Sequence, residues 1–103
     1  METIKIDVGV YTTLKLDLKE YDFTGIEKLI LTAKNFAHEE PIIEKEFNES
    51  IEYDILITPE ESKKLNQYAE YDFDMICTDG KRYKASDIGK IELVKCVGVC
   101  DGE

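Results

Sequence analysis

The chain has 103 residues, a length that suits one domain with a modest hydrophobic core. Hydrophobic residues make up 43% of it, too many for a disordered chain, and no apolar run reaches the ~18 residues that a membrane span needs. The net charge of −10 argues against direct binding to nucleic acid or to an anionic membrane, because both would repel the chain.

The N-terminus and the cysteines indicate where the chain is made. Residues 1–5 contain neither the basic region nor the apolar region of a secretory signal, so we expect synthesis in the cytoplasm. The three cysteines, Cys77, Cys96 and Cys100, are an odd number that fits reduced thiols. Because the only histidine, His38, is far from them in sequence, we expect no metal site.

The first third of the chain carries strand patterns. Apolar and polar residues alternate over 4–10 and over 14–18, which predicts two half-buried strands. Residues 20–25 are typical of a loop. The more continuous apolar run over 26–34 predicts a central strand that is covered on one face and partly covered on the other.

The middle of the chain continues this pattern. Residues 35–40 form a polar connection, and Pro41 opens a strand that reaches Phe47. A turn over 48–50 separates that strand from a clearly alternating strand over 51–57.

One segment carries a helix signal. Thr58 is a favourable N-cap, Pro59 suits the first helical position, and Glu61 completes a capping box with Thr58. Leu65 is the only apolar anchor, so we expect a helix of about two turns over 58–67.

The last third of the chain predicts three more strands. Residues 71–77 alternate, and Asp79-Gly80 predicts a hairpin turn of type I′ leading into a return strand over 81–85. The final strand is expected over 89–99, and about 100–103 should form a frayed end.

These elements predict an all-β fold. Seven or eight short strands with one helix indicate an antiparallel immunoglobulin-like β-sandwich that forms a single domain over 1–103. The helix would connect the fifth and sixth strands, where such sandwiches cross between sheets. Tyr71 is placed to act as a structural tyrosine corner at that crossing. A small closed barrel is the competing fold.

Catalytic and ligand-binding patterns are missing from the sequence. It contains no nucleophile elbow, phosphate-binding loop or zinc-protease motif, so we expect no catalytic residue, cofactor or metal and a protein that is not an enzyme. Asp72 and Asp74 share the outer face of one predicted strand about 7 Å apart. Without a glycine-containing oxygen-rich loop or a tryptophan platform, a solvated face is favoured there over a Ca²⁺ or glycosidase site.

Five aromatic residues fall in or beside predicted connections: Tyr11, Tyr21, Phe23, Phe36 and Tyr68. Aromatic side chains in loops can anchor a protein interface. They can equally seal the ends of a sandwich, and the sequence leaves both interpretations open.

Several segments together resemble a known family. They are the stretch Thr12–Leu16, the loop Phe23–Ile26, the cap Ile55–Glu61, the strand Ala69–Met75, the Asp79-Gly80 hairpin and the closing strand Gly89–Ile91. In this order, over nearly the whole chain, they resemble the small immunoglobulin-like domains of tailed phages and prophages, such as the N-terminal domain of baseplate upper proteins. Ala69 stands where that family usually has glycine, and Phe23 where it usually has leucine.

The resemblance implies a non-enzymatic structural or adaptor module of a tail, baseplate or neck. Its partners would be other protein subunits of a phage-like assembly, including further copies of itself. It would be made in the cytoplasm of a bacterial host and carried in a virion. The net charge supports an alternative: a small acidic inhibitor or DNA mimic that binds a host nucleic-acid-binding protein. An enzyme or carbohydrate-binding module ranks last.

Overall fold

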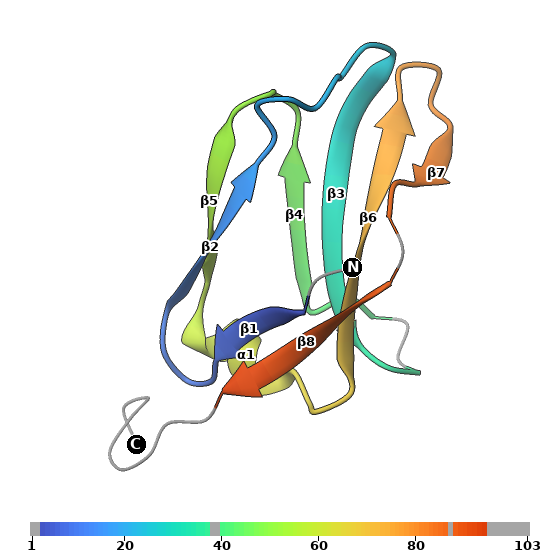
Figure 1. The fold of residues 1–103 in the computed structure, drawn as a ribbon. Helices are drawn as coiled ribbons and strands as arrows, with labels where there is room; N and C mark the ends of the chain where they lie inside the picture. The colour runs from blue at the N-terminus through green and yellow to red at the C-terminus, as the bar shows by residue number, and fades with distance from the viewer. Residues whose placement is uncertain (1–2, 38–39, 87, 95–103) are drawn as a thin grey trace.

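The computed structural model describes residues 3–37, 40–86 and 88–94. In these ranges the elements run in the order β1 (Ile4–Asp7), β2 (Thr12–Asp17), β3 (Ile26–Asn35), β4 (Ile43–Phe47), β5 (Glu52–Ile57), α1 (Pro59–Lys64), β6 (Ala69–Cys77), β7 (Arg82–Lys84) and β8 (Gly89–Val94) (Figure 1). The prediction of a mostly-β chain with one short helix is therefore confirmed. α1 has six residues, and no helix in the described part of the chain is long and apolar enough to cross a membrane.

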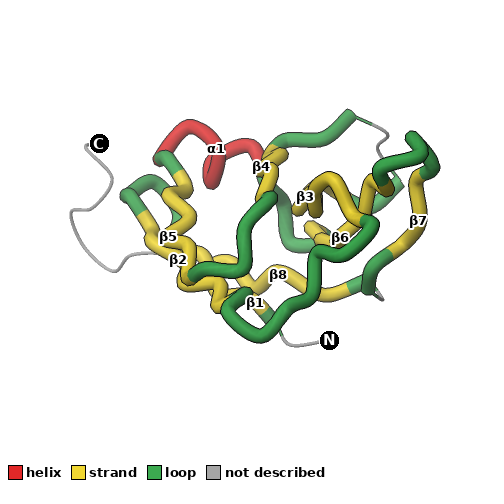
Figure 2. Tube along the Cα trace, turned by 90° about the horizontal axis from the view of Figure 1, so that it is seen from above, coloured by secondary structure: helices red, strands yellow, loops and turns green. Residues whose placement is uncertain are grey.

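The strands form two hydrogen-bonded sheets. The larger has the order β1-β8-β6-β3-β4, with β7 also paired to β6, and the smaller consists of β2 and β5. Seen from above, the larger sheet curls, so that β2 and β5 lie across from β3 and β6 (Figure 2). The apolar core fills the space that these elements enclose.

One strand pair runs against expectation. β1 pairs with β8 in parallel, matching Ile4 with Ile91 and Asp7 with Val94, so the expected purely antiparallel arrangement is wrong at this pair. The other five pairings in the described ranges are antiparallel. A parallel pair needs a long connection, which these strands have because they come from opposite ends of the chain. Alternation of side chains reports strand character but not strand direction.

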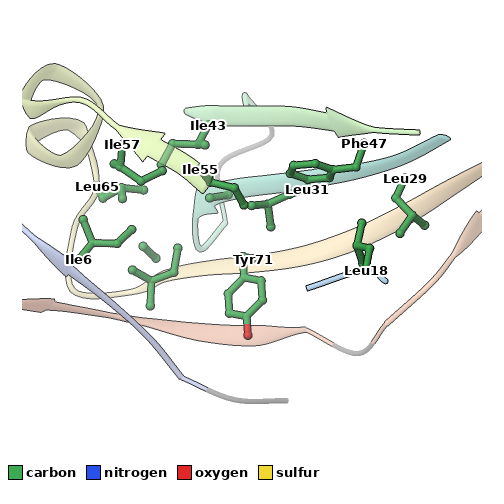
Figure 3. Close-up of a cluster of buried hydrophobic side chains, with 13 residues drawn as sticks. Ile6, Leu18, Leu29, Leu31, Ile43, Phe47, Ile55, Ile57, Leu65 and Tyr71 are labelled. Carbon is green, nitrogen blue, oxygen red and sulfur yellow. The ribbon is translucent and has the colours of Figure 1, made fainter. Parts of the chain in front are cut away.

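β3 is the central strand of the core. Leu29, Leu31 and Ala33 on its inner face are each 3% exposed, and Ile30 on the outer face is also buried. The inner face of β3 is thus covered and the outer face partly covered, as the continuous apolar run predicts. β3 packs its inner face against buried side chains of the other elements, among them Ile6, Leu18, Ile43, Phe47, Ile55, Ile57, Leu65, Ala69, Tyr71 and Ile91 (Figure 3).

The capping box at α1 is present. The Thr58 hydroxyl accepts a hydrogen bond from the Glu61 N–H at 3.2 Å, and the Glu61 carboxylate accepts one from the Thr58 N–H at 2.9 Å. α1 ends at Lys64, earlier than the expected 67, because Leu65 takes an extended conformation and its side chain enters the core. The single apolar anchor therefore ends the helix instead of lying inside it.

The β6–β7 hairpin differs from the expected type I′ turn. Gly80 has a φ of 89°, but Asp79 is not among the described residues with positive φ. The Gly80 N–H donates to the Cys77 carbonyl at 2.9 Å, and the Cys77 N–H donates to the Lys81 carbonyl at 2.8 Å. This pattern matches a type I turn followed by a glycine bulge, in which only the glycine needs the left-handed region. β8 is described to Val94, so the rest of the expected final strand and the expected frayed end lie outside the described residues.

Ser62 joins α1 to the turn between β1 and β2. Its side chain is fully buried, accepts a hydrogen bond from the Gly9 N–H at 2.9 Å and donates one to the Pro59 carbonyl at 3.0 Å. The hydroxyl thereby satisfies a backbone N–H that has no strand partner.

Replacing Ser62 with alanine should lower the free energy of unfolding by about 1–3 kcal/mol, because the buried Gly9 N–H loses its acceptor. Urea unfolding followed by circular dichroism measures this change. Ser50→Ala is the matched control, since the Ser50 hydroxyl bonds the Tyr21 carbonyl in an exposed setting. Equal losses for the two variants would contradict the anchoring role of Ser62.

Candidate functional site

Two of the five loop aromatics contribute to the core. Tyr21 and Phe23, in the connection between β2 and β3, contact each other edge to face with ring centroids 4.9 Å apart. Both are partly buried and pack against the central cluster. For this pair the structure favours the end-sealing interpretation.

The other three aromatics are exposed at the opposite end of the molecule, which carries α1. Tyr11, Phe36 and Tyr68 are 66%, 64% and 65% exposed. They lie in the β1–β2 turn, the β3–β4 loop and the α1–β6 loop, which all lie at the lower end in Figure 1. We call these three residues the helix-end surface. Exposed aromatic side chains are common anchors of protein interfaces.

A hydrogen-bond network holds Phe36 and Tyr68 together. The Phe36 N–H donates to the Tyr68 carbonyl at 3.1 Å. The Asn35 amide bridges the loops by donating to the Lys64 carbonyl at 3.0 Å and accepting from the Asn66 N–H at 2.8 Å. The Asn66 side chain in turn accepts from the Tyr68 N–H at 2.8 Å. Two loops far apart in sequence thus present their aromatic side chains from one connected frame.

Sequence reasoning missed the residues that build this frame. Asn35 and Asn66 lie in polar connections, and asparagine is common there for many reasons. Their pairing joins segments 31 residues apart, so no local pattern could indicate it.

Ala37, directly after Phe36, has a φ of 68°, and it is the only non-glycine residue with positive φ in the described ranges. The left-handed region is unfavourable for a residue with a Cβ. Such conformations persist where the surroundings impose them, and they cluster at binding and switch segments. The strained position therefore marks the Phe36 loop as a segment under constraint.

Ala37→Gly should raise the free energy of unfolding by about 0.5–1 kcal/mol, because glycine adopts a positive φ without the Cβ penalty. Thermal unfolding measures the shift. Ala85→Gly is the control with the opposite expected sign, since Ala85 lies in an ordinary backbone conformation that bonds Phe73. A loss of stability in Ala37→Gly would refute the proposed strain.

A second candidate lies on the outer face of β3, β4, β6 and β7. It is an open concavity of about 360 Å³ lined by charged side chains that include Asp72, Asp74, Arg82 and Lys84. Asp74 contacts the Arg82 guanidinium at 2.6 and 2.7 Å. Lys84 Nζ lies 2.7 Å from Asp72 Oδ2 and 3.1 Å from Asp74 Oδ1.

The expected solvated face is wrong for Asp74, because its side chain is only 8% exposed. Burial alone would raise the pKa of Asp74, but hydrogen bonds from Arg82 and Lys84 outweigh it and hold the pKa below the ordinary value. The hydrogen bonds that the Lys84 ammonium donates to Asp72 and Asp74 raise the pKa of Lys84. Two acids and two bases are thus paired with each other, and this cluster fastens the short strand β7 to β6.

Asp74→Asn should lower stability by about 1–3 kcal/mol at neutral pH, because the ionised carboxylate is the form that Arg82 and Lys84 stabilise. Since folding lowers the pKa of Asp74, this stabilisation is present above about pH 4 and is lost as the pH falls through the folded-state pKa. Denaturant unfolding from pH 7 to pH 2.5 should show the two proteins converging in acid.

Asp54→Asn serves as the control for that titration, since the Asp54 carboxylate is 65% exposed and pairs with Lys15 at 3.3 Å. An exposed pair contributes little, so this variant should follow the wild type at every pH. A pH-independent gap between wild type and Asp74→Asn would contradict the charge-based account.

Neither candidate brings together a catalytic set. In residues 3–37, 40–86 and 88–94 no group of three or more His, Cys, Asp or Glu side chains could hold a metal ion. Cys77 is half-buried and free. His38, Cys96 and Cys100 lie outside the described residues.

Tyr71 lies at the third position of β6 and is 4% exposed. Its ring is among the core side chains in Figure 3 and meets Phe73 edge to face at 6.3 Å. Its role as a tyrosine corner stays a prediction.

Some of the acidic residues are paired with lysines. Lysines alternate with them across strand pairs: Lys15 meets Asp54 at 3.3 Å and Lys28 meets Glu46 at 3.0 Å. A DNA mimic needs carboxylates grouped at roughly phosphate spacing on one surface. Interleaved ion pairs weaken that alternative.

We compared the chain with protein-family models and with curated proteins. No protein-family model matches the chain, and no curated protein matches it.

Proposed function

We propose that the chain is a non-catalytic adaptor module that binds another protein through the helix-end surface. The observation that carries this proposal is the joint presentation of Phe36 and Tyr68, about two-thirds exposed, on loops joined by direct hydrogen bonds. A loop backbone that is already held in place loses little entropy on binding, and aromatic anchors dominate the energetics of protein interfaces.

The fold supports an immunoglobulin-like assignment within this proposal. The order β1-β8-β6-β3-β4 opposite β2-β5, with a helix leading from β5 into β6, fits a sandwich in which the first strand pairs in parallel with the last. The resemblance to phage and prophage baseplate domains suggests a subunit of a phage-like assembly as the partner. The acidic inhibitor remains the second candidate, and its only support is the net charge.

The double variant Phe36→Ser/Tyr68→Ser should weaken partner binding at least 30-fold, because each aromatic anchor contributes on the order of 2 kcal/mol or more. The tagged chain is expressed in its source organism, the protein that co-purifies with it is identified, and the pair is rebuilt from purified components. Light scattering gives the stoichiometry, and calorimetry gives the affinity of each variant.

Ile51→Ser/Tyr83→Ser is the matched control, since these side chains are 44% and 48% exposed but lie in the β4–β5 turn and on β7, away from the helix-end surface. It should bind as the wild type does. A strict monomer without a reproducible partner would overturn the proposal, as would equal losses of affinity in the two double variants.

A further inference from the structure

β7 lies beside β6 at the outside of the larger sheet (Figure 1) and has little contact with the core. In the described ranges it is the only strand without a buried or half-buried residue. The buried cluster and the side chains packed against it include no residue of β7. Among the described strands β7 pairs with β6 alone, over the three positions Arg82–Lys84. Apolar burial therefore contributes little to holding β7 in place.

Ion pairs provide the attachment that packing does not. Arg82 contacts the Asp74 carboxylate at 2.6 and 2.7 Å, and Lys84 lies 2.7 Å from Asp72 and 3.1 Å from Asp74. Both carboxylates belong to β6 and are mostly buried, whereas the two cations are more than half exposed. β7 is thus a cationic strand that lies against two acids, with its charged groups within reach of solvent ions.

The two ends of β7 are fixed by features that do not depend on its ion pairs. Before it, Gly80 has a φ of 89°, a conformation that glycine leaves and regains without a Cβ penalty. After it, the Ser86 hydroxyl accepts a hydrogen bond from the Phe73 N–H at 2.9 Å. We call the segment between these points, residues 81–85, the strap. One short strand ladder and the ion pairs attach it to the rest of the molecule.

From these features we infer that the strap opens and closes while the rest of the fold stays intact, and that its ion pairs with β6 hold it closed. Segments with few buried apolar contacts open at a lower free-energy cost than the core. Opening separates Arg82 and Lys84 from Asp72 and Asp74 and uncovers the β6 backbone over Asp74–Ile76. The strap therefore couples ionic strength to the exposure of an acidic strand edge, independently of the helix-end surface.

Salt acts on the strap and on the whole fold in opposite directions. It screens the attraction between the exposed cations of β7 and the carboxylates of β6, which favours opening. It also screens the repulsion within a chain of net charge −10, which favours the compact state as a whole. Opposite responses to salt at β7 and in the core would therefore identify a local opening.

Native-state amide hydrogen exchange, followed by NMR on the intact chain, tests the inference. The reporters are the N–H groups of Cys77 and Ala85, which donate across the hairpin to the Lys81 and Phe73 carbonyls at 2.8 Å. The reference is Leu31 of β3, a strand that is paired on both sides. The reporters should exchange at least about 100-fold faster than the reference. Low urea should accelerate the reference alone, because a local opening exposes little surface.

Salt and charge variants then test what holds the strap closed. Raising sodium chloride from about 0.01 M to about 1 M should accelerate the reporters about 5-fold and leave Leu31 unchanged or slower. The double variant Arg82→Gln/Lys84→Gln should accelerate the reporters at least about 10-fold at low salt and remove their response to salt. Lys28→Gln is the matched control, since Lys28 pairs with Glu46 between β3 and β4 at 3.0 Å and that pair stays intact when the strap opens. It should leave the reporters unchanged.

The inference is overturned if the reporters exchange at the rate of Leu31 with the same dependence on urea, because β7 would then open only when the whole chain unfolds. It is also overturned if salt leaves the reporters unchanged, or if Arg82→Gln/Lys84→Gln and Lys28→Gln affect them equally. The wild-type experiments in urea and in salt need no variant, so they decide the question even if the double variant does not fold.

Discussion

The two-stranded sheet of β2 and β5 is held by the apolar side chains that it shares with the larger sheet. A two-stranded ribbon is marginally stable by itself in water. Its inner residues, such as Ile55 and Ile57, are buried in the same cluster as Leu31 of β3 and Phe47 of β4. An edge-to-face contact at 4.8 Å between Phe47 and Tyr53 joins β4 to β5. The larger sheet has six strands and curls around this cover of two.

Because the two sheets do not close into a barrel, they have edge strands to which another chain could pair. The described edges differ in how they oppose such pairing. On β4 the side chain of Lys45 lies on the inner face between Ile43 and Phe47 and pairs with Glu61 of α1 at 3.5 Å. An inward-pointing charge on an edge strand opposes pairing with another chain. Among the described strands, β8 pairs with β1 along Ile91–Val94 and with β6 only at Gly89 and Lys90, so its second side has less strand cover than its first.

Local patterns predicted the elements well, because alternation and caps are set by neighbouring residues. β5 and β6 begin and end within two residues of the predicted 51–57 and 71–77, and Thr58 and Glu61 lie at the start of α1. What depends on distant residues could not be predicted. The parallel pairing of β1 with β8, the burial of Asp74 beneath Arg82 and Lys84, and the bridge from Asn35 to Asn66 all join separate segments. The five loop aromatics were found from sequence, but only the fold divides them into Tyr21 and Phe23, which pack on the core, and the exposed helix-end surface.

The two candidate sites differ in what remains available for a partner. In the outer concavity Arg82 and Lys84 are already bound to Asp72 and Asp74, so a ligand would have to break ion pairs that include a buried carboxylate. At the helix end the hydrogen bonds are made by backbone and amide groups, while the rings of Phe36 and Tyr68 remain in water. Covering those rings adds hydrophobic stabilisation without disturbing the network beneath them.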